Sequence, residues 1–232
     1  MINFNTLPKS LDFDDISLVT RVTSSIEHRS DCDTSSDFCG TQLKYPLVAS
    51  PMTDVVNSTT ALELRKNGCI GILPRFTAIK DQVDEFLLAT REINNIPVSL
   101  KSVGCAIGVA GDWLERLNKL YLVGCRVFCF DIAAGNNFLL GKAIEKTKTK
   151  YPDVYIIAGN VFTNECFKWL CEHGISVVRI NVANGSRCKT RNVTGMYYGP
   201  VSVINECVEA RDSLPNEFKS VKILSCGGIR CS

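Results

Sequence analysis

The chain has 232 residues, of which 45% are hydrophobic and 22% are charged, a composition typical of one globular domain large enough to bury a core. Basic and acidic residues are nearly balanced, 26 against 24, and no basic run is interleaved with aromatics, so we expect no nucleic-acid partner. No stretch reaches the roughly 18 consecutive apolar residues of a membrane span, and the first residues do not resemble a secretory signal. We therefore expect no membrane association and a cytoplasmic location.

Most of the twelve cysteines lie inside apolar runs, as Cys129 does between Phe128 and Phe130, and not at the loop spacings of a disulfide framework. We interpret them as small core residues. Cys32 and Cys39 are the only pair close together in a polar stretch, and no histidine stands at ligand spacing from them. A solvated loop is therefore favoured there over a zinc site.

Short runs rich in valine and isoleucine recur along the chain, each followed by a stretch of helical period, which is typical of a parallel β/α architecture. Strands are predicted at residues 46–49, 69–73, 104–109, 126–132, 154–161, 177–182 and 222–225. A helix is predicted to begin at Asp112, with Glu115 as its capping-box partner, and to end at Gly124. Two further helices are predicted, one from Ser58 to Gly68 and one that begins at Thr163 or Asn164 and ends at Gly174.

The spacing of the predicted strands is close to the roughly 30 residues per unit of a (β/α)8 TIM barrel. The rival, a doubly wound sheet, would carry a glycine-rich turn after its first strand, whereas the glycine turns here follow strands six and seven. The chain ends at Ser232, seven residues past the last predicted strand, so we expect an incomplete barrel of about seven βα units. Residues 1–45 are predicted to form an N-terminal capping segment, and residues 46–232 a partial TIM-barrel catalytic domain.

In a barrel of this kind the active site lies at the C-terminal ends of the strands. Gly185 and Ser186 follow the sixth predicted strand, and Gly227 and Gly228 follow the seventh. Small residues let backbone N–H groups approach a ligand closely, and late loops are where such barrels commonly bind phosphate. The glycines of either turn alone would be explained by the need for a tight turn. Two such glycine turns in adjacent loops favour a phosphate site.

Cys188 differs from the other cysteines because it lies in a polar loop between Arg187 and Lys189. Nearby cations favour the thiolate, which is the nucleophilic form, so Cys188 is a candidate catalytic residue. Asp131 ends an otherwise apolar strand, where a carboxylate contacts a ligand or caps the following helix. His28 and His173 offer no comparable context.

Several motifs together resemble the IMP dehydrogenase/GMP reductase family over about 220 residues. These are Phe13-Asp14-Asp15, Val48-Ala49-Ser50-Pro51-Met52, Ile157-Ala158-Gly159-Asn160-Val161, Gly185-Ser186-Arg187-Cys188-Lys189-Thr190-Arg191 and Gly227-Gly228-Ile229-Arg230. They occur in the family's order. The resemblance implies a purine nucleotide oxidoreductase in which hydride passes between C2 of a purine nucleotide and NAD or NADP, through a covalent intermediate on Cys188.

The same resemblance implies roles for particular residues. Cys188 and Thr190 would be catalytic. The purine nucleotide monophosphate would be bound by Ser50, Met52, Asn160, Ser186, Gly227 and Gly228. Asp131, Ala133 and Gly135 would contact the dinucleotide, and main-chain carbonyls at Gly185 and Cys188 would hold a monovalent cation such as K⁺. A complete chain would be expected to form a homotetramer.

Some residues depart from the family pattern. Cys226 replaces the aspartate that precedes Gly-Gly, and a thiol accepts hydrogen bonds only weakly. The short distance from Phe76 to Gly104 leaves no room for paired regulatory domains, which favours GMP reductase, whereas Ser50-Pro51-Met52 and Arg179 look more like a dehydrogenase. We favour the reductase direction slightly, and a non-catalytic nucleotide-binding relative or a fragment is the alternative.

Overall fold

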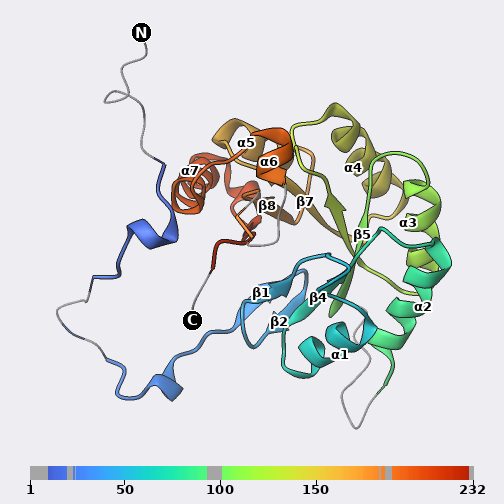
Figure 1. Ribbon diagram of the computed structural model, residues 1–232, viewed down its shortest axis with the longest axis horizontal. Helices are drawn as coiled ribbons and strands as arrows, with labels where there is room; N and C mark the ends of the chain where they lie inside the picture. The colour runs from blue at the N-terminus through green and yellow to red at the C-terminus, as the bar shows by residue number, and fades with distance from the viewer. Residues whose placement is uncertain are drawn as a thin grey trace.

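The computed structural model describes residues 10–19, 23, 25–92, 101–182, 184–185 and 190–229. Its central element is a parallel sheet in the order β3-β4-β5-β6-β7-β8-β9, which curves into an open ring with helices on its outer side (Figure 1). The strands are β3 (Val48–Ala49), β4 (Ile70–Leu73), β5 (Val103–Ile107), β6 (Val127–Asp131), β7 (Tyr155–Val161), β8 (Val177–Ile180) and β9 (Lys222–Ser225). The predicted fold class, an incomplete TIM barrel, is confirmed by this half-barrel of seven strands.

Helices follow the strands along the chain, as the hydrophobic periodicity predicts. They are α1 (Ser58–Lys66), α2 (Ile79–Thr90), α3 (Trp113–Leu122), α4 (Phe138–Lys150), α5 (Asn164–Glu172), α6 (Thr190–Thr194) and α7 (Pro200–Ser213), with 3-10 turns η2 (Phe13–Asp15), η3 (Arg29–Asp31) and η4 (Asn216–Phe218). None of the helices in the described residues has the length and apolar character needed to cross a membrane.

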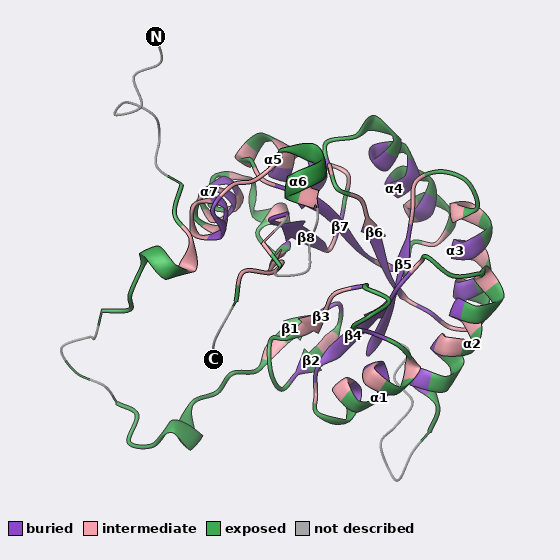
Figure 2. Cartoon of the chain, in the orientation of Figure 1, coloured by how far each residue is buried: buried purple, intermediate pink, exposed green. Residues whose placement is uncertain are grey.

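The central strands β4 to β8 are buried on both faces, which explains why they are nearly continuous apolar runs, whereas the edge strands β3 and β9 are only partly buried. Side chains facing outward, such as Phe128 and Phe130 of β6, pack with the helices in one large core. Side chains facing inward, such as Val127 and Cys129 of the same strand, form a second cluster inside the ring. Figure 2 shows the buried strands enclosed by helices whose outer faces are exposed. Seven of the ten described cysteines are buried, as expected of small core residues.

A hairpin of β1 (Ser36–Phe38) and β2 (Thr41–Leu43) packs its Phe38 and Leu43 side chains against the inward-facing residues of the sheet. Cys39 and Gly40 at its turn have φ values of 52° and 67°, the backbone of a tight two-residue hairpin turn. The predicted solvated loop is therefore wrong for Cys39, which is 5% exposed, because the hairpin turn carries it into the core. Burial raises the pKa of the Cys39 thiol.

The helix ends differ in detail from the prediction. At the start of α3 the Asp112 side chain makes no capping hydrogen bond to the helix backbone, because its carboxylate pairs instead with Arg116, one turn along, at 2.7 Å. The predicted capping box with Glu115 is therefore wrong, although the helix begins and ends where expected. Gly124 has φ 102°, which is the left-handed conformation that glycine adopts after a helix.

The sixth predicted strand is shorter than expected. Strand β8 ends at Ile180, whereas the prediction extended it to residue 182. Asn181 leaves the strand because its φ of 69° lies in the left-handed region, which is incompatible with a continuing strand. The loop that leads to Gly185 therefore begins two residues earlier than predicted.

The first described residues lie far from the hairpin. The carbonyl of Leu11 accepts hydrogen bonds from the N–H groups of Val201 and Ser202 at the start of α7. The described residues between Leu11 and β1 lie outside the barrel (Figure 1). The predicted division at residue 45 remains a prediction.

Candidate functional site

Two glycine-bearing turns meet at the C-terminal edge of the sheet. Gly227 and Gly228, directly after β9, have φ values of 78° and 82°, where residues with a Cβ are strained. A Cβ on Gly227 would lie 2.8 Å from the backbone nitrogen of Gly185. Only glycine therefore allows the loop after β9 to lie against the loop after β8, and the two turns singled out in the sequence are neighbours in the fold.

A cavity of about 140 Å³ opens beside these turns, between the ends of β3 and β9. Ser50, Arg179, Cys226 and Gly227 are among the residues that line it. Ser50 Oγ lies 3.6 Å from Cys226 Sγ. The cavity therefore joins the loop after the first barrel strand to the glycine turn after the last described one.

Arg179, on β8, is the cation of this site. It is 7% exposed and pairs through Nη1 with Asp131 Oδ1, while Nη2 donates to Cys226 Sγ at 3.1 Å. Burial opposes the charge on Arg179, but the neighbouring groups, Asp131 among them, outweigh it and raise the pKa of the guanidinium. The cation therefore stays charged and links β6, β8 and the turn after β9.

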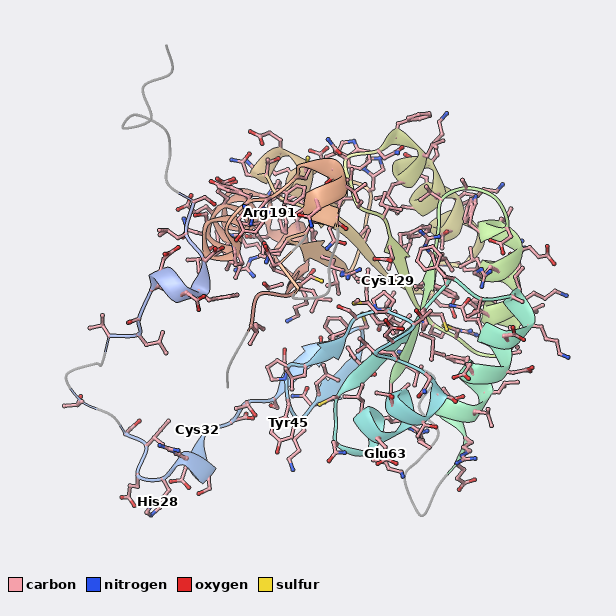
Figure 3. The ribbon with its side chains drawn as sticks, viewed as in Figure 1. His28, Cys32, Tyr45, Glu63, Cys129 and Arg191 are labelled. Atoms are coloured by element: carbon pink, nitrogen blue, oxygen red, sulfur yellow. The ribbon has the colours of Figure 1, made fainter. Side chains whose placement is uncertain are left out.

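Cys129 lies on β6 inside the ring of strands (Figure 3). Burial raises the pKa of its thiol to about 12, even though the nearby Arg179 acts in the opposite direction. At neutral pH Cys129 is therefore a protonated, inert thiol. Cys226 differs because it is only half-buried and lines the cavity.

A chain of hydrogen bonds crosses the ends of three strands. Nδ2 of Asn160, on β7, donates to the backbone carbonyl of Asn181, and Nδ2 of Asn181 donates to Ser225 Oγ on β9 at 2.8 Å. Asn160 is 5% exposed, and Asn181 is fully buried. These contacts fix the Asn160 side chain at the edge of the sheet that carries the glycine turns.

The turn after β6 holds the three residues expected to contact a dinucleotide. The Gly135 N–H donates to the carbonyl of Asn160 at 2.8 Å, and a Cβ on Gly135 would lie 2.7 Å from a methyl group of Val161. Packing against β7 therefore accounts for Gly135. The Asp131 side chain is 24% exposed, and a carboxylate paired through one oxygen accepts further hydrogen bonds. Asp131 thus fits a ribose hydroxyl, whereas Ala133 is placed in the same turn without a specific contact.

The remaining predicted residues are less closely joined to the cavity. Met52 lies in the turn after β3, where its N–H donates to the carbonyl of Ser50. Thr190 begins α6, and the next residue, Arg191, which Figure 3 labels, is exposed. Cys188 and Ser186 lie outside the described residues. The proposed cation site at Gly185 and Cys188 is therefore described only at Gly185, and the described side chains hold no cluster of three metal-ligating residues.

The sequence prediction did not anticipate the contacts of Arg179 and Asn181. The family resemblance gives Arg179 only as a dehydrogenase-like residue. Its signal is a single cation in the apolar run Val177-Val178-Arg179-Ile180, because a buried charge requires a partner. Asn181 carries a weaker signal, since asparagine is one of the few residues that adopt positive φ.

A curved parallel β/α sheet with glycine turns and a buried ion pair at its C-terminal edge places this protein among the TIM-barrel folds, in which active sites commonly lie at that edge. The family is more specific. The model of the IMP dehydrogenase / GMP reductase domain matches residues 10–232, and the chain belongs to this family. The resemblance seen in the sequence motifs is thereby confirmed.

Relatives with both enzyme names match the chain. It is 26% identical over 260 residues to inosine-5′-monophosphate dehydrogenase of Cryptosporidium parvum, covering 97% of this chain and 63% of that protein. It is 29% identical over 219 residues to GMP reductase of Onchocerca volvulus, covering 90% of this chain and 58% of that protein. Against the Escherichia coli dehydrogenase the identity is 35% over 130 residues, which is 56% of this chain and 26% of that enzyme. The chain spans less than two thirds of the length of these relatives.

Proposed function

We propose that this chain forms the nucleotide-binding and catalytic part of a purine nucleotide oxidoreductase. The observation that carries the proposal is the contact between the Gly227 turn and Gly185. It brings the candidate phosphate turn against the loop that leads to Cys188. A purine nucleoside monophosphate would then have its phosphate at the glycine turns and its base near Cys188. Ser50 and Met52 would lie against the base and ribose, and Ser186 would add its hydroxyl to the phosphate site.

The proposed chemistry begins with attack of the Cys188 thiolate on C2 of the purine, which forms a bond between Sγ and C2. In the reductase direction ammonia leaves C2 of GMP, hydride is added at C2, and release of the sulfur yields IMP. In the dehydrogenase direction hydride leaves C2 of IMP, and water then cleaves the bond to sulfur to yield XMP. Thr190 would help to activate the ammonia or water.

A nicotinamide cofactor would supply the hydride acceptor or donor when bound. The partly exposed Asp131 would accept a hydrogen bond from a cofactor ribose, since only one of its oxygens is engaged by Arg179. Ala133 and Gly135 keep the same turn small enough for close approach. The proposed cofactor is NAD or NADP, and the proposal includes a K⁺ ion bound at Gly185 and Cys188. It also includes assembly into a homotetramer and a cytoplasmic location.

Between the two directions, GMP reductase is slightly favoured and IMP dehydrogenase is nearly its equal. The segment between Phe76 and Gly104 includes β5 from Val103 and α2, and the few other residues leave no room for paired regulatory domains. Arg179 and Ser50-Pro51-Met52 support the dehydrogenase. Absorbance of the reduced nicotinamide at 340 nm, with IMP plus NAD and separately with GMP plus NADPH, distinguishes the two.

The covalent step is tested with 6-chloro-IMP, an electrophilic purine nucleotide. Mass spectrometry of the digested protein should show one adduct, at Cys188, that competing IMP prevents. Cys32 is exposed and provides the internal control for nonspecific alkylation. Equal labelling of Cys32 and Cys188 would contradict a tuned nucleophile.

A second function is favoured by Cys226. Where the family carries a carboxylate, this turn presents a sulfur in contact with Arg179, and a weak acceptor holds sugar hydroxyls poorly. This substitution suits a nucleotide-binding relative without turnover. Tight binding of IMP or GMP, weaker binding of inosine or guanosine, and no nicotinamide turnover would favour this second function.

A further inference from the structure

Asn181 lies where the C-terminal ends of three strands meet. It follows β8, its N–H donates to the carbonyl of Val161 on β7 at 3.1 Å, and its Nδ2 donates to Ser225 Oγ on β9 at 2.8 Å. Its φ is 69°, a value that glycine, asparagine and aspartate adopt far more readily than other residues. One buried residue thus joins β7, β8 and β9 beneath the glycine turns.

The carbonyl oxygen of Asn181 determines which end of the Asn160 carboxamide is free. Nδ2 of Asn160 donates to this carbonyl, while the Asn160 backbone is held by Ile132 and Gly135, each at 2.8 Å. Among the described residues no donor reaches Asn160 Oδ1. Because the amino end is occupied, Asn160 presents its oxygen, a hydrogen-bond acceptor.

Stability alone does not explain asparagine at position 181. Its Oδ1 is buried and has no hydrogen-bond partner in the described part of the chain. A buried carbonyl oxygen without a donor is destabilising. This cost belongs to the Asn181 side chain, whereas the contact with Asn160 comes from the Asn181 backbone, whose carbonyl accepts a hydrogen bond from Asn160 Nδ2.

We infer that Asn181 is a positioning residue for the nucleotide site. Its left-handed backbone turns the carbonyl toward Asn160 and thereby fixes the Asn160 side chain with Oδ1 toward the bound nucleotide. The site then selects a ligand that places an N–H or O–H donor opposite Asn160 and rejects one that places an acceptor there. The inference rests on the proposed function for the ligand class, a purine nucleoside monophosphate.

A double-mutant cycle tests the inference with IMP as the probe. Asn181→Val keeps roughly the side-chain volume but introduces a β-branched residue that resists positive φ, so the carbonyl should turn away. Asn181→Gly is the matched control, because it keeps the backbone conformation and the carbonyl while losing the bond to Ser225. Asn160→Ala and the double variant Asn160→Ala/Asn181→Val complete the cycle.

Isothermal titration should show that Asn160→Ala weakens IMP binding about tenfold, the effect of one lost hydrogen bond to a ligand. Asn181→Val should weaken it by a similar factor in the parent chain, but should have little further effect once Asn160 is alanine. Asn181→Gly should stay within about threefold of the parent, since the anchoring carbonyl is kept. A merely structural role would instead lower affinity equally in both backgrounds, and that result would overturn the inference.

The inference and the proposed function fail in different ways. If the parent chain binds neither IMP nor GMP, both fail. If it binds IMP but the cycle is additive, only the positioning role fails. Should Asn181→Val not fold, hydrogen exchange of ¹⁵N-labelled asparagine side chains in the parent decides. The Asn160 carboxamide should exchange at least tenfold more slowly than that of Asn205, which bonds to Glu209 on the exposed face of α7. Equal exchange rates would overturn the inference.

Discussion

Arg179 donates a hydrogen bond to Cys226, with 3.1 Å between Nη2 and Sγ. This contact places the cation of the site against the glycine turn after β9, since Gly227 follows Cys226 directly. Sulfur is a weak acceptor, so the hydrogen bond from Nη2 to Cys226 is weak, whereas Nη1 forms an ion pair with Asp131. The site thus offers donors at Ser50 and Arg179 but no strong acceptor at position 226.

Cys226→Asp is expected to strengthen nucleotide binding. A carboxylate at this position would accept from Arg179 and from ligand hydroxyls by charge-assisted hydrogen bonds, which are about twice as strong as neutral ones. We expect the affinity for IMP to rise about tenfold in isothermal titration. Cys226→Ser is the size-matched control and should change affinity little. Equal affinity of the two variants would show that no ligand hydroxyl reaches this position.

Arg179→Met is expected to destabilise the fold, because it leaves the Asp131 carboxylate unpaired inside the barrel mouth. Breaking a buried ion pair costs about 3–5 kcal/mol, and the partial exposure of Asp131 reduces this to roughly 2–3 kcal/mol. Urea unfolding followed by circular dichroism measures the loss. Adding Asp131→Asn should recover part of it, since no charge then remains. A single Arg179→Met variant as stable as the parent would mean that the pair adds nothing.

Gly227→Ala is expected to disrupt the glycine turns more than its backbone angle alone predicts. Gly174, after α5, has a similar φ of 73° and open space where a Cβ would stand, whereas a Cβ on Gly227 would meet the Gly185 backbone. Gly174→Ala should therefore cost about 1 kcal/mol in thermal unfolding. Gly227→Ala should cost more and should weaken IMP binding at least about tenfold. If the Gly227→Ala variant loses affinity for IMP but binds inosine as the parent does, the phosphate lies at this turn. If it binds both IMP and inosine as the parent does, the phosphate does not lie there.

Alkaline pH is expected to destabilise the protein through its buried thiols. Burial raises the pKa of Cys129, Cys171 and Cys207 to about 12 from a reference value of 9.0. The folded chain therefore retains protons that the unfolded chain releases, so this stabilisation is complete below about pH 9 and is lost as the pH rises from 9 toward 12. Melting temperatures measured from pH 8 to 11 should fall more gently for Cys207→Ala than for the parent. Cys32→Ala, at an exposed position, should leave the slope unchanged, and identical slopes for both variants would contradict the assignment.

Hydrophobic periodicity was sufficient to predict the barrel strands, because a strand that is buried on both faces has a continuous run of valine, isoleucine and leucine in its sequence. The strand at residues 222–225 matches β9 at both ends. The glycine turns at Gly185 and Gly227 could also be predicted, since they follow strands whose ends meet at one edge of a parallel sheet. Their positions in sequence imply their proximity.

Local patterns were less informative where a residue had two possible partners. Asp112 has both a helix backbone and Arg116 within reach, and the side chain of Arg116 competes successfully for it. Likewise, Cys39 lies in a polar segment and is nevertheless buried, because the hairpin folds back into the ring of strands. In both cases the outcome depends on the difference in free energy between two conformations, and the neighbouring residues in the sequence do not determine that difference.

The chain's amino-acid pattern was enough to establish an incomplete parallel β/α barrel of the IMP dehydrogenase/GMP reductase family, because strand periodicity and family motifs are local. The contacts of Arg179 with Asp131 and Cys226, and the chain from Asn160 through Asn181 to Ser225, appear only in the folded molecule. Their partners are about 20 to 50 residues apart in sequence. The curvature of the open sheet brings inward-facing side chains of separate strands together, and the low polarity of the interior then favours hydrogen bonds and ion pairs between the buried polar groups.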